Sequence, residues 1–270
     1  MKLETIIKGE LTEWPYTHPS MPSDTLLKFY GADSEQLYQR NLKYNLNWMY
    51  RDIEIEYHFN KQSLRMCKDI DEVEDDYIYF SGTSFSMGVG IRESDRFSDI
   101  ISKQIDMDFI NCAGPSYTIK AQFISFTNFL NSGYKLPKIF VIEYPPSHAY
   151  TYYNNDSYLF YYSKNIPNDR PNHLEAYNNL LNTDHYTNEA QIYRQSLIGI
   201  CKRLKIKFIE LSFHKSDKFA TNLPIVDIDT NKNDINYCYA RDLRVSDGEY
   251  SGHPGIGIHL LASDIILKQI

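Results

Sequence analysis

Apolar residues in this 270-residue chain form short runs that alternate with amphipathic stretches from about residue 77 onwards. The short runs are rich in aromatic and β-branched residues and have the length of buried strands. They lie at Tyr77–Phe80, Phe109–Ala113, Ile139–Tyr144 and Lys207–Phe213. The amphipathic stretches predict helices at Asp95–Ile105, Tyr117–Leu130, Asn188–Leu204 and about Gly255–Lys268.

Strands separated by helices of this length predict βαβ units, and therefore an α/β fold with a mostly parallel sheet covered on both faces. Two long segments, about 146–187 and 214–252, interrupt the alternation, and connections of this length often form lids or binding loops. Residues 1–76 lack the alternation and end in the acidic stretch Lys68–Asp76. We therefore expect an N-terminal extension, 1–76, packed on a core domain, 77–270.

The composition excludes some partners. The formal net charge of −7 provides no basic surface for nucleic acid or for anionic membranes. No apolar run approaches the ~18 residues of a membrane span, and the first residues contain no signal-peptide core. We expect synthesis in the cytoplasm, with no nucleic-acid or membrane partner. The sequence does not indicate an oligomeric state.

Cysteine and histidine spacing provides no metal or disulfide motif. The four cysteines are far apart and predict reduced, mostly buried thiols; they are Cys67, Cys112, Cys201 and Cys238. The eight histidines show neither HExxH nor HxH spacing. We therefore predict no metal and no cofactor.

Ser84 lies in a small-residue turn after the first predicted strand, within YIYFSGTSFSMGVG (77–90). In parallel α/β sheets ligands bind beyond the carboxyl ends of the strands, which is where this serine must lie. The turn lacks the lysine of a phosphate-binding loop and the G-x-S-x-G order of an α/β-hydrolase elbow. Two alternatives remain for Ser84: a helix N-cap, a role that serine favours, or a nucleophile.

Three blocks in order along the chain resemble those of the SGNH, or GDSL, hydrolases. FSGTSFSMGVGI resembles the G-D-S block with Ser84 as nucleophile, FINCAGPSYT places Gly114 at an oxyanion donor, and SDGEYSGHPGIGIHLLASDI places His253 at the catalytic histidine. The resemblance covers about residues 77–268 and implies a flavodoxin-like three-layer α/β/α fold. YHFNKQSLRM (57–66) resembles a prefix of phage-borne members, which implies association with a virus particle as one location.

The family pattern is not complete on the oxyanion side. Thr83 stands where the family has Asp before the nucleophile. The expected Asn block is replaced by VIEYPPSHAY, in which Ser147 is the expected third oxyanion donor, beside the amides of Ser84 and Gly114, and His148 is the alternative.

The carboxylate that pairs with the catalytic histidine in this family is not at the family spacing either. D-x-x-H would need an acid at position 250, which is Tyr250. Asp247 lies six residues before His253 and Asp242 lies eleven before it, so we expect Asp247, the nearer one, to hold the imidazole. His259, on the last predicted helix, is expected to be structural.

The resemblance implies a serine-dependent ester hydrolase that acts on small acyl esters through an acyl-Ser84 intermediate. O-acetylated carbohydrate is the leading substrate class, and the tyrosine-rich stretch His148–Ser163 is a candidate stacking surface for sugars. The departures from the pattern favour an alternative, a catalytically silent module that binds glycan or protein, for example as a virion component.

Overall fold

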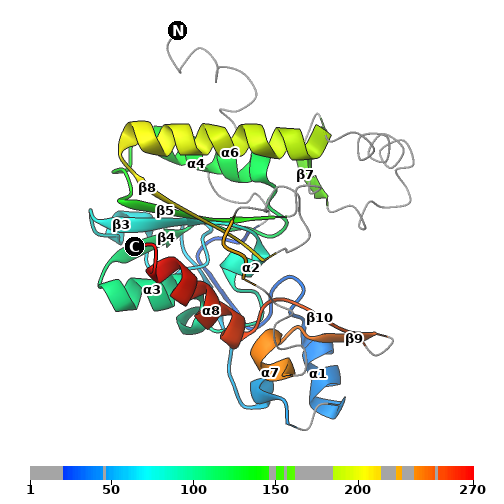
Figure 1. Cartoon of the computed structure of the whole chain (residues 1–270). Coiled ribbons are helices and arrows are strands. Elements are labelled where there is room, and N and C mark those ends of the chain that lie inside the picture. Colours follow the sequence, from blue (N-terminus) through cyan, green and yellow to red (C-terminus); the bar gives the residue numbers. More distant parts are fainter. Residues whose placement is uncertain are drawn as a thin grey trace.

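The computed structural model describes residues 21–44, 47–145, 150–154, 157–161, 185–213, 223–226, 234–246 and 249–270. Its centre is a four-stranded parallel sheet in the order β4–β3–β5–β8. The strands are β3 (Tyr77–Ser81), β4 (Asp108–Asn111), β5 (Ile139–Tyr144) and β8 (Lys207–Ser212). Figure 1 shows helices on both faces of the sheet: α4 (Ile119–Asn131) and α6 (His185–Leu204) on one, and α3 (Phe97–Ile105) and α8 (Ile256–Leu267) on the other. The predicted three-layer α/β/α fold is confirmed.

The strand residues alternate between two apolar cores. Tyr77 and Tyr79 of β3 pack in the core beneath α4 and α6, whereas Ile78 and Phe80 pack in the core against α3 and α8. All residues of β3 and β5 are buried, as expected for central strands of a parallel sheet. The carboxyl ends of these two strands point to the same edge of the sheet, and the turn with Ser84 follows β3 directly.

The predicted elements are correct to within a few residues, and local structure explains two of the shifted helix starts. The helix predicted from Asp95 begins at Phe97, because the chain first forms a short 3-10 turn, η4 (Glu93–Asp95). The helix predicted from Tyr117 begins at Ile119, because the Thr118 side chain caps it by accepting the amide of Ala121.

The segment before the sheet has its own small elements. They are β1 (Thr25–Leu27), α1 (Glu35–Tyr44), η2 (Met49–Arg51), β2 (Tyr57–Phe59) and η3 (Ile70–Glu72), with β1 and β2 antiparallel. Trp48, Tyr50 and Tyr57 of this segment are buried in one cluster with Met87 and Ala240 from beyond residue 77. These contacts agree with packing on the core, and the division at residue 76 stays a prediction.

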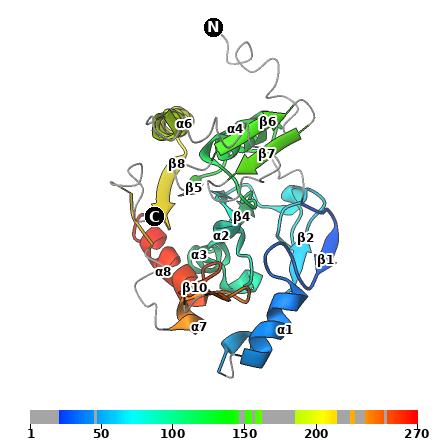
Figure 2. The ribbon, with the colours of Figure 1, turned by 90° about the vertical axis from the view of Figure 1, so that its right-hand side faces the viewer.

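Two short helices and two hairpins lie around the layers. They are α2 (Ser84–Met87), α7 (Ile235–Cys238), and the antiparallel hairpins β6 (Tyr150–Asn154)–β7 (Ser157–Tyr161) and β9 (Arg244–Ser246)–β10 (Glu249–Ser251). Figure 2 shows the first hairpin beside α4 and the second one close to α7. The side chains of the tyrosine-rich stretch lie outside the described residues, so its sugar-stacking role stays a prediction. No described helix has the length and apolar character needed to cross a membrane.

Candidate active site

Ser84 is the first residue of α2 and follows the tight turn after β3. The N-cap is Thr83, whose hydroxyl accepts the amide of Phe85 at 3.1 Å. The N-cap alternative for Ser84 is therefore not what the structure has, since its neighbour fills that role. The Ser84 hydroxyl instead lies 2.8 Å from Nε2 of His253.

His253 links Ser84 to a buried carboxylate. Its Nδ1 lies 2.7 Å from Oδ2 of Asp242, and its own backbone amide donates to Oδ1 of the same carboxylate at 3.0 Å. The imidazole packs edge-on against Phe85, with ring centroids 5.5 Å apart. The side chains of Ser84, His253 and Asp242 thus form one hydrogen-bonded chain that begins beyond the end of β3.

The carboxylate that faces Nδ1 of His253 is Asp242, whereas we expected Asp247 in this place. Asp247 lies outside the described residues. The position of Asp242 follows from the hairpin β9–β10, in which Arg244 pairs with Ser251. Two positions further towards the base of that hairpin lie Asp242 and His253, so the inserted hairpin brings the more distant aspartate opposite the histidine.

Asp242 is held as an anion. Burial alone would raise the pKa of its carboxyl, but the charge of His253 and the two hydrogen bonds from it outweigh burial and lower that pKa below its ordinary value. Its side chain is 1% exposed, and that of His253 is 14% exposed. An ionised carboxylate in this place fixes the imidazole tautomer that can accept a proton at Nε2.

The N-terminal segment anchors the loop that carries Asp242. Asp33 forms a buried ion pair with Arg241, the residue before the aspartate, at 2.6 Å. Asn41 on α1 donates its side-chain amide to the carbonyl of Leu243, the residue after it, at 2.8 Å. Gly90 accepts the amide of Arg241 at 2.9 Å and has a φ of +81°, where a Cβ would also meet Ala240 at 2.8 Å.

Glu143, a residue that the sequence reasoning missed, supports the turn that carries Ser84. It is fully buried at the end of β5, and its Oε2 accepts the amide of Thr83 at 2.6 Å and the hydroxyl of Ser86 at 3.0 Å. Gly82 makes room for this carboxylate, because a Cβ there would lie 2.6 Å from the same oxygen. A glutamate within a strand that otherwise reads as apolar, IFVIEY, is the signal that could have found it.

Burial also shifts the pKa of Glu143. Complete removal from water raises the pKa of its carboxyl, although the hydrogen bonds from Thr83 and Ser86 act in the opposite direction. Its second oxygen, Oε1, has no hydrogen-bond partner among the described residues. A buried polar atom without a hydrogen bond lowers the stability of the fold. The contacts of the other oxygen, Oε2, must therefore offset this cost.

The oxyanion side differs from expectation. The amide of Gly114 donates to the carbonyl of Gly82 at 3.1 Å, because the register of β3 and β4 continues past the strand ends, where Cys112 likewise donates to Phe80. This amide is therefore already engaged, and the expectation that it faces an oxyanion is not met in this arrangement. Ser147 and His148 lie outside the described residues. The amide of Ser84, at a helix N-terminus, has no acceptor within its helix.

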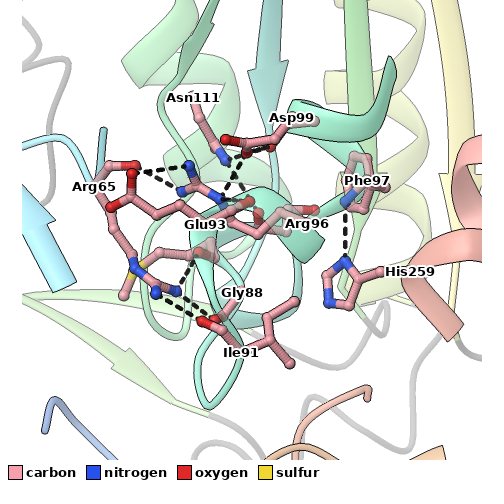
Figure 3. A network of polar contacts seen from close by, with 12 residues as sticks. Arg65, Gly88, Ile91, Glu93, Arg96, Phe97, Asp99, Asn111 and His259 are labelled. Carbon is pink, nitrogen blue, oxygen red and sulfur yellow. Dashed lines mark hydrogen bonds and ion pairs between the residues drawn. The ribbon is translucent and has the colours of Figure 1, made fainter. Parts of the chain in front are cut away.

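Two buried arginines tie the chain beyond α2 to the N-terminal segment (Figure 3). Arg65 donates to the carbonyls of Gly88 and Ile91, the second at 2.8 Å, and Arg96 donates to the carbonyl of Arg65 at 2.6 Å. His259 lies at the same network, where its Nδ1 accepts the amide of Phe97 at 3.3 Å. Its contacts are with the core and not with Ser84, as expected for a structural histidine.

Sequence and structure comparisons show what the chain is similar to. No family model and no curated protein matches the sequence. Similar solved structures include a carbohydrate esterase whose active site displays divergent catalytic and non-catalytic binding functions, with a TM-score of 0.43, 12% identity, and 72% of this chain and 68% of that chain covered. The psychrotrophic esterase EstA from Pseudoalteromonas sp. is similar at a TM-score of 0.41 and 12% identity, over 72% of this chain and 96% of that one.

Further similar structures belong to the family whose motifs the sequence resembles. A lipolytic protein of the G-D-S-L family from Desulfitobacterium hafniense has a TM-score of 0.32 and 14% identity, over 72% of this chain and 99% of that chain. Esterases and G-D-S-L proteins thus recur among the similar structures.

Proposed function

We propose that this protein is a serine-dependent ester hydrolase of the SGNH type, with Ser84 as nucleophile, His253 as general base and acid, and Asp242 as the acid that holds His253. The observation that carries the proposal is the continuous hydrogen-bonded chain from the Ser84 hydroxyl through both ring nitrogens of His253 to Asp242. A serine hydroxyl becomes a good nucleophile only when a base takes its proton during attack, and the contact with Nε2 supports His253 in that role.

The reaction proceeds in two balanced halves. Oγ of Ser84 attacks the acyl carbon while its proton passes to Nε2 of His253, and the intermediate expels the alcohol, which takes that proton as the C–O bond breaks. Water then attacks the acyl-enzyme as His253 accepts one of its protons. The carboxylic acid leaves, and the proton returns to the Ser84 oxygen. Asp242 stays ionised and stabilises the imidazolium in both halves.

The arrangement of oxyanion donors favours a slow enzyme. The amide of Ser84 is a candidate donor, whereas that of Gly114 is bound to the carbonyl of Gly82. Loss of one donor typically costs about 10²–10³ in rate, which weakens turnover without abolishing it. Ser147 remains our proposal for a further donor, with a tenfold or larger loss of turnover expected for Ser147→Ala.

Small acyl esters, with O-acetylated carbohydrate first among them, are the proposed substrates. Support comes from the family motifs around Ser84 and His253 and from the carbohydrate and acetyl xylan esterases among the similar structures. The preference between free and sugar-linked acetate esters is measured by comparing kcat/KM on a chromogenic acetate and on acetylated oligosaccharides.

A fluorophosphonate probe tests the proposal, since only an activated serine is labelled. The wild-type protein should be labelled at Ser84 and should hydrolyse short acyl esters. Ser84→Ala should lose both the labelling and the ester hydrolysis. Ser196→Ala, on helix α6, should keep them. A wild-type protein that is neither labelled nor active on any short ester would contradict an esterase function.

The engaged amide of Gly114 favours one alternative, a catalytically silent module that binds glycan or protein at the same site. A silent module retains binding without turnover. Binding of acetylated oligosaccharide that is unchanged by Ser84→Ala, together with no turnover in the wild-type protein, would support this alternative.

A further inference from the structure

A second cluster of reactive side chains lies where the N-terminal segment meets the turn after α2. It consists of His58 on β2, Cys67 and Glu93, whose ligand atoms all lie within 4.8 Å of one another. None of the three contacts Ser84, His253 or Asp242 in the hydrogen bonds described above. The cluster is thus separate from the candidate active site.

Two distances in the cluster are close to those between ligands of one ion, and all three ligand atoms lie within 4.8 Å of one another. Nδ1 of His58 lies 3.6 Å from Oε1 of Glu93, and Sγ of Cys67 lies 3.2 Å from Oε2 of the same carboxylate. Ligands bonded to zinc at about 2.0–2.3 Å in a tetrahedron are about 3.3–3.6 Å apart. Small side-chain movements would therefore bring all three atoms to one ion.

The surroundings also suit a cation. The cluster lines a pocket of about 330 Å³ together with Glu54, Glu56, Arg92 and Ser94. The charge of Arg92 is balanced by Asp95, whose carboxylate lies 2.7 Å from it, so the glutamates leave an excess of negative charge. A carboxylate of the pocket or a water molecule can complete a four-coordinate site.

The use of Glu93 as a ligand would not leave a buried arginine without a partner. Arg96 lies 3.9 Å from Glu93 but 2.9 Å from Asp99, which is its closer counterion. The network in Figure 3, in which both carboxylates face Arg96, therefore retains an ion pair if Glu93 turns towards the pocket.

We propose that His58, Cys67 and Glu93 bind a divalent transition-metal ion, with zinc as the expected occupant. Thiolate and imidazole ligands select zinc over magnesium and calcium, which prefer all-oxygen sites. The Cys67 thiol loses its proton to solvent when the Zn–S bond forms. Because the ligands lie 9 and 26 positions apart along the chain, no spacing motif marks the site in the sequence.

The expected consequence is a clamp between two parts of the chain. His58 and Cys67 belong to the N-terminal segment, and Glu93 begins η4 beyond the nucleophile helix. An ion that binds the folded but not the unfolded chain raises the melting temperature in a concentration-dependent way. Zinc should therefore stabilise the protein and magnesium should not.

Cobalt titration tests the site directly, because cobalt replaces zinc and its thiolate bond gives a charge-transfer band. Cys67 is the only exposed one of the four cysteines, so the band reports on this position. The wild-type protein should bind one equivalent and show the band, and zinc should remove it. Cys67→Ser should lose the band, whereas Asp71→Asn, at an exposed acid outside the pocket, should keep it. A wild-type protein without the band, or a Cys67→Ser variant with it, overturns the proposal.

A second variant keeps the test independent of folding and of esterase activity. His58→Ala, at a half-exposed side chain, should lower zinc affinity by more than about tenfold in competition with a chromogenic chelator, since even outer-shell changes typically cost about 10–100-fold. Ser84→Ala should bind zinc as the wild-type protein does. An unchanged affinity in His58→Ala overturns the site, whatever the protein does with esters.

Discussion

Ser84 and the pair Asp242–His253 meet at one hydrogen bond, yet different kinds of structure hold them. Ser84 follows a fully buried strand, and a carboxylate of the neighbouring strand, Glu143, holds the amide before it. Asp242 and His253 lie outside the sheet, at the base of a hairpin, and are anchored by Asp33 and Asn41 of the N-terminal segment. Ser84 is thus positioned by the core, whereas Asp242 and His253 are positioned by the N-terminal segment.

This difference shows which contacts must stay intact to position Ser84, and which must stay intact to position Asp242 and His253. The turn of Ser84 depends on buried polar contacts that tolerate little change in shape, since an unsatisfied buried group costs about 1–3 kcal/mol. The loop of Asp242 depends on a buried ion pair between Asp33 and Arg241, and the loss of one partner of such a pair typically costs about 3–5 kcal/mol. Substitutions near Ser84 and substitutions near Asp242 should therefore have separable effects.

The largest effect is expected on the nucleophile side. Ser84→Ala removes the hydroxyl that lies 2.8 Å from Nε2 of His253 and should lower kcat by about 10⁴–10⁶-fold on a chromogenic acetate ester. Thermal unfolding should be nearly unchanged, because the N-cap of α2 is Thr83. Residual turnover within tenfold of the wild-type value would exclude Ser84 as nucleophile.

Loss of the acid should have the next largest effect. Asp242→Asn keeps the shape but favours the wrong imidazole tautomer, so kcat should fall by about 10⁴-fold. Asp247→Asn is the matched control and should retain activity. The comparison of these two kcat values decides between the aspartates, and a loss in Asp247→Asn alone would show that the contact with Asp242 is not the catalytic one.

Glu143 should have a smaller effect, which depends on the substitution. Glu143→Gln keeps an oxygen that can accept the amide of Thr83, so turnover should remain within about tenfold. Glu143→Leu leaves that amide unsatisfied and should cost about 1–3 kcal/mol of stability in urea unfolding, with a clear fall in kcat. Equal activity of the Gln and Leu variants would mean that the carboxylate does not position the turn.

The smallest effect on turnover is expected from His259, whose effect is instead on the pH dependence of stability. Burial first, and then the charges of Arg96 and Arg65, lower its pKa to about 3. The unfolded chain, with a histidine pKa of ~6.5, binds the proton first as the pH falls, so the stability that a neutral His259 contributes is lost between about pH 6.5 and 3.

Urea unfolding across this pH range measures that loss. The slope from one histidine is at most about 1.4 kcal/mol per pH unit, and His259→Leu should reduce the slope by up to this amount. Parallel pH dependences of wild type and variant would show that His259 does not titrate on unfolding. In the same scan, the slope of stability against pH for Asp242→Asn should differ from that of the wild-type protein mainly below about pH 4. There the wild-type protein loses the stability that the lowered pKa of Asp242 provides.

The sequence by itself determined the layered fold and two of the three residues in the hydrogen-bonded chain. Hydrophobic periodicity is local, so the apolar runs at 77–80 and 139–144 and the helices between the strands could be predicted from neighbouring residues alone. The position of Ser84 after a buried strand and of His253 before the last helix could also be predicted, because both follow from the order of the motifs along the chain.

Only the tertiary structure decided the rest, because those contacts join residues far apart in the sequence. Spacing favoured Asp247, whereas the register of the hairpin β9–β10 brings Asp242 to His253. Neither the support of Thr83 by Glu143, 60 positions away, nor the engagement of the Gly114 amide by Gly82 follows from any local pattern. Pairing across strands depends on register, and register is set by packing of the whole core.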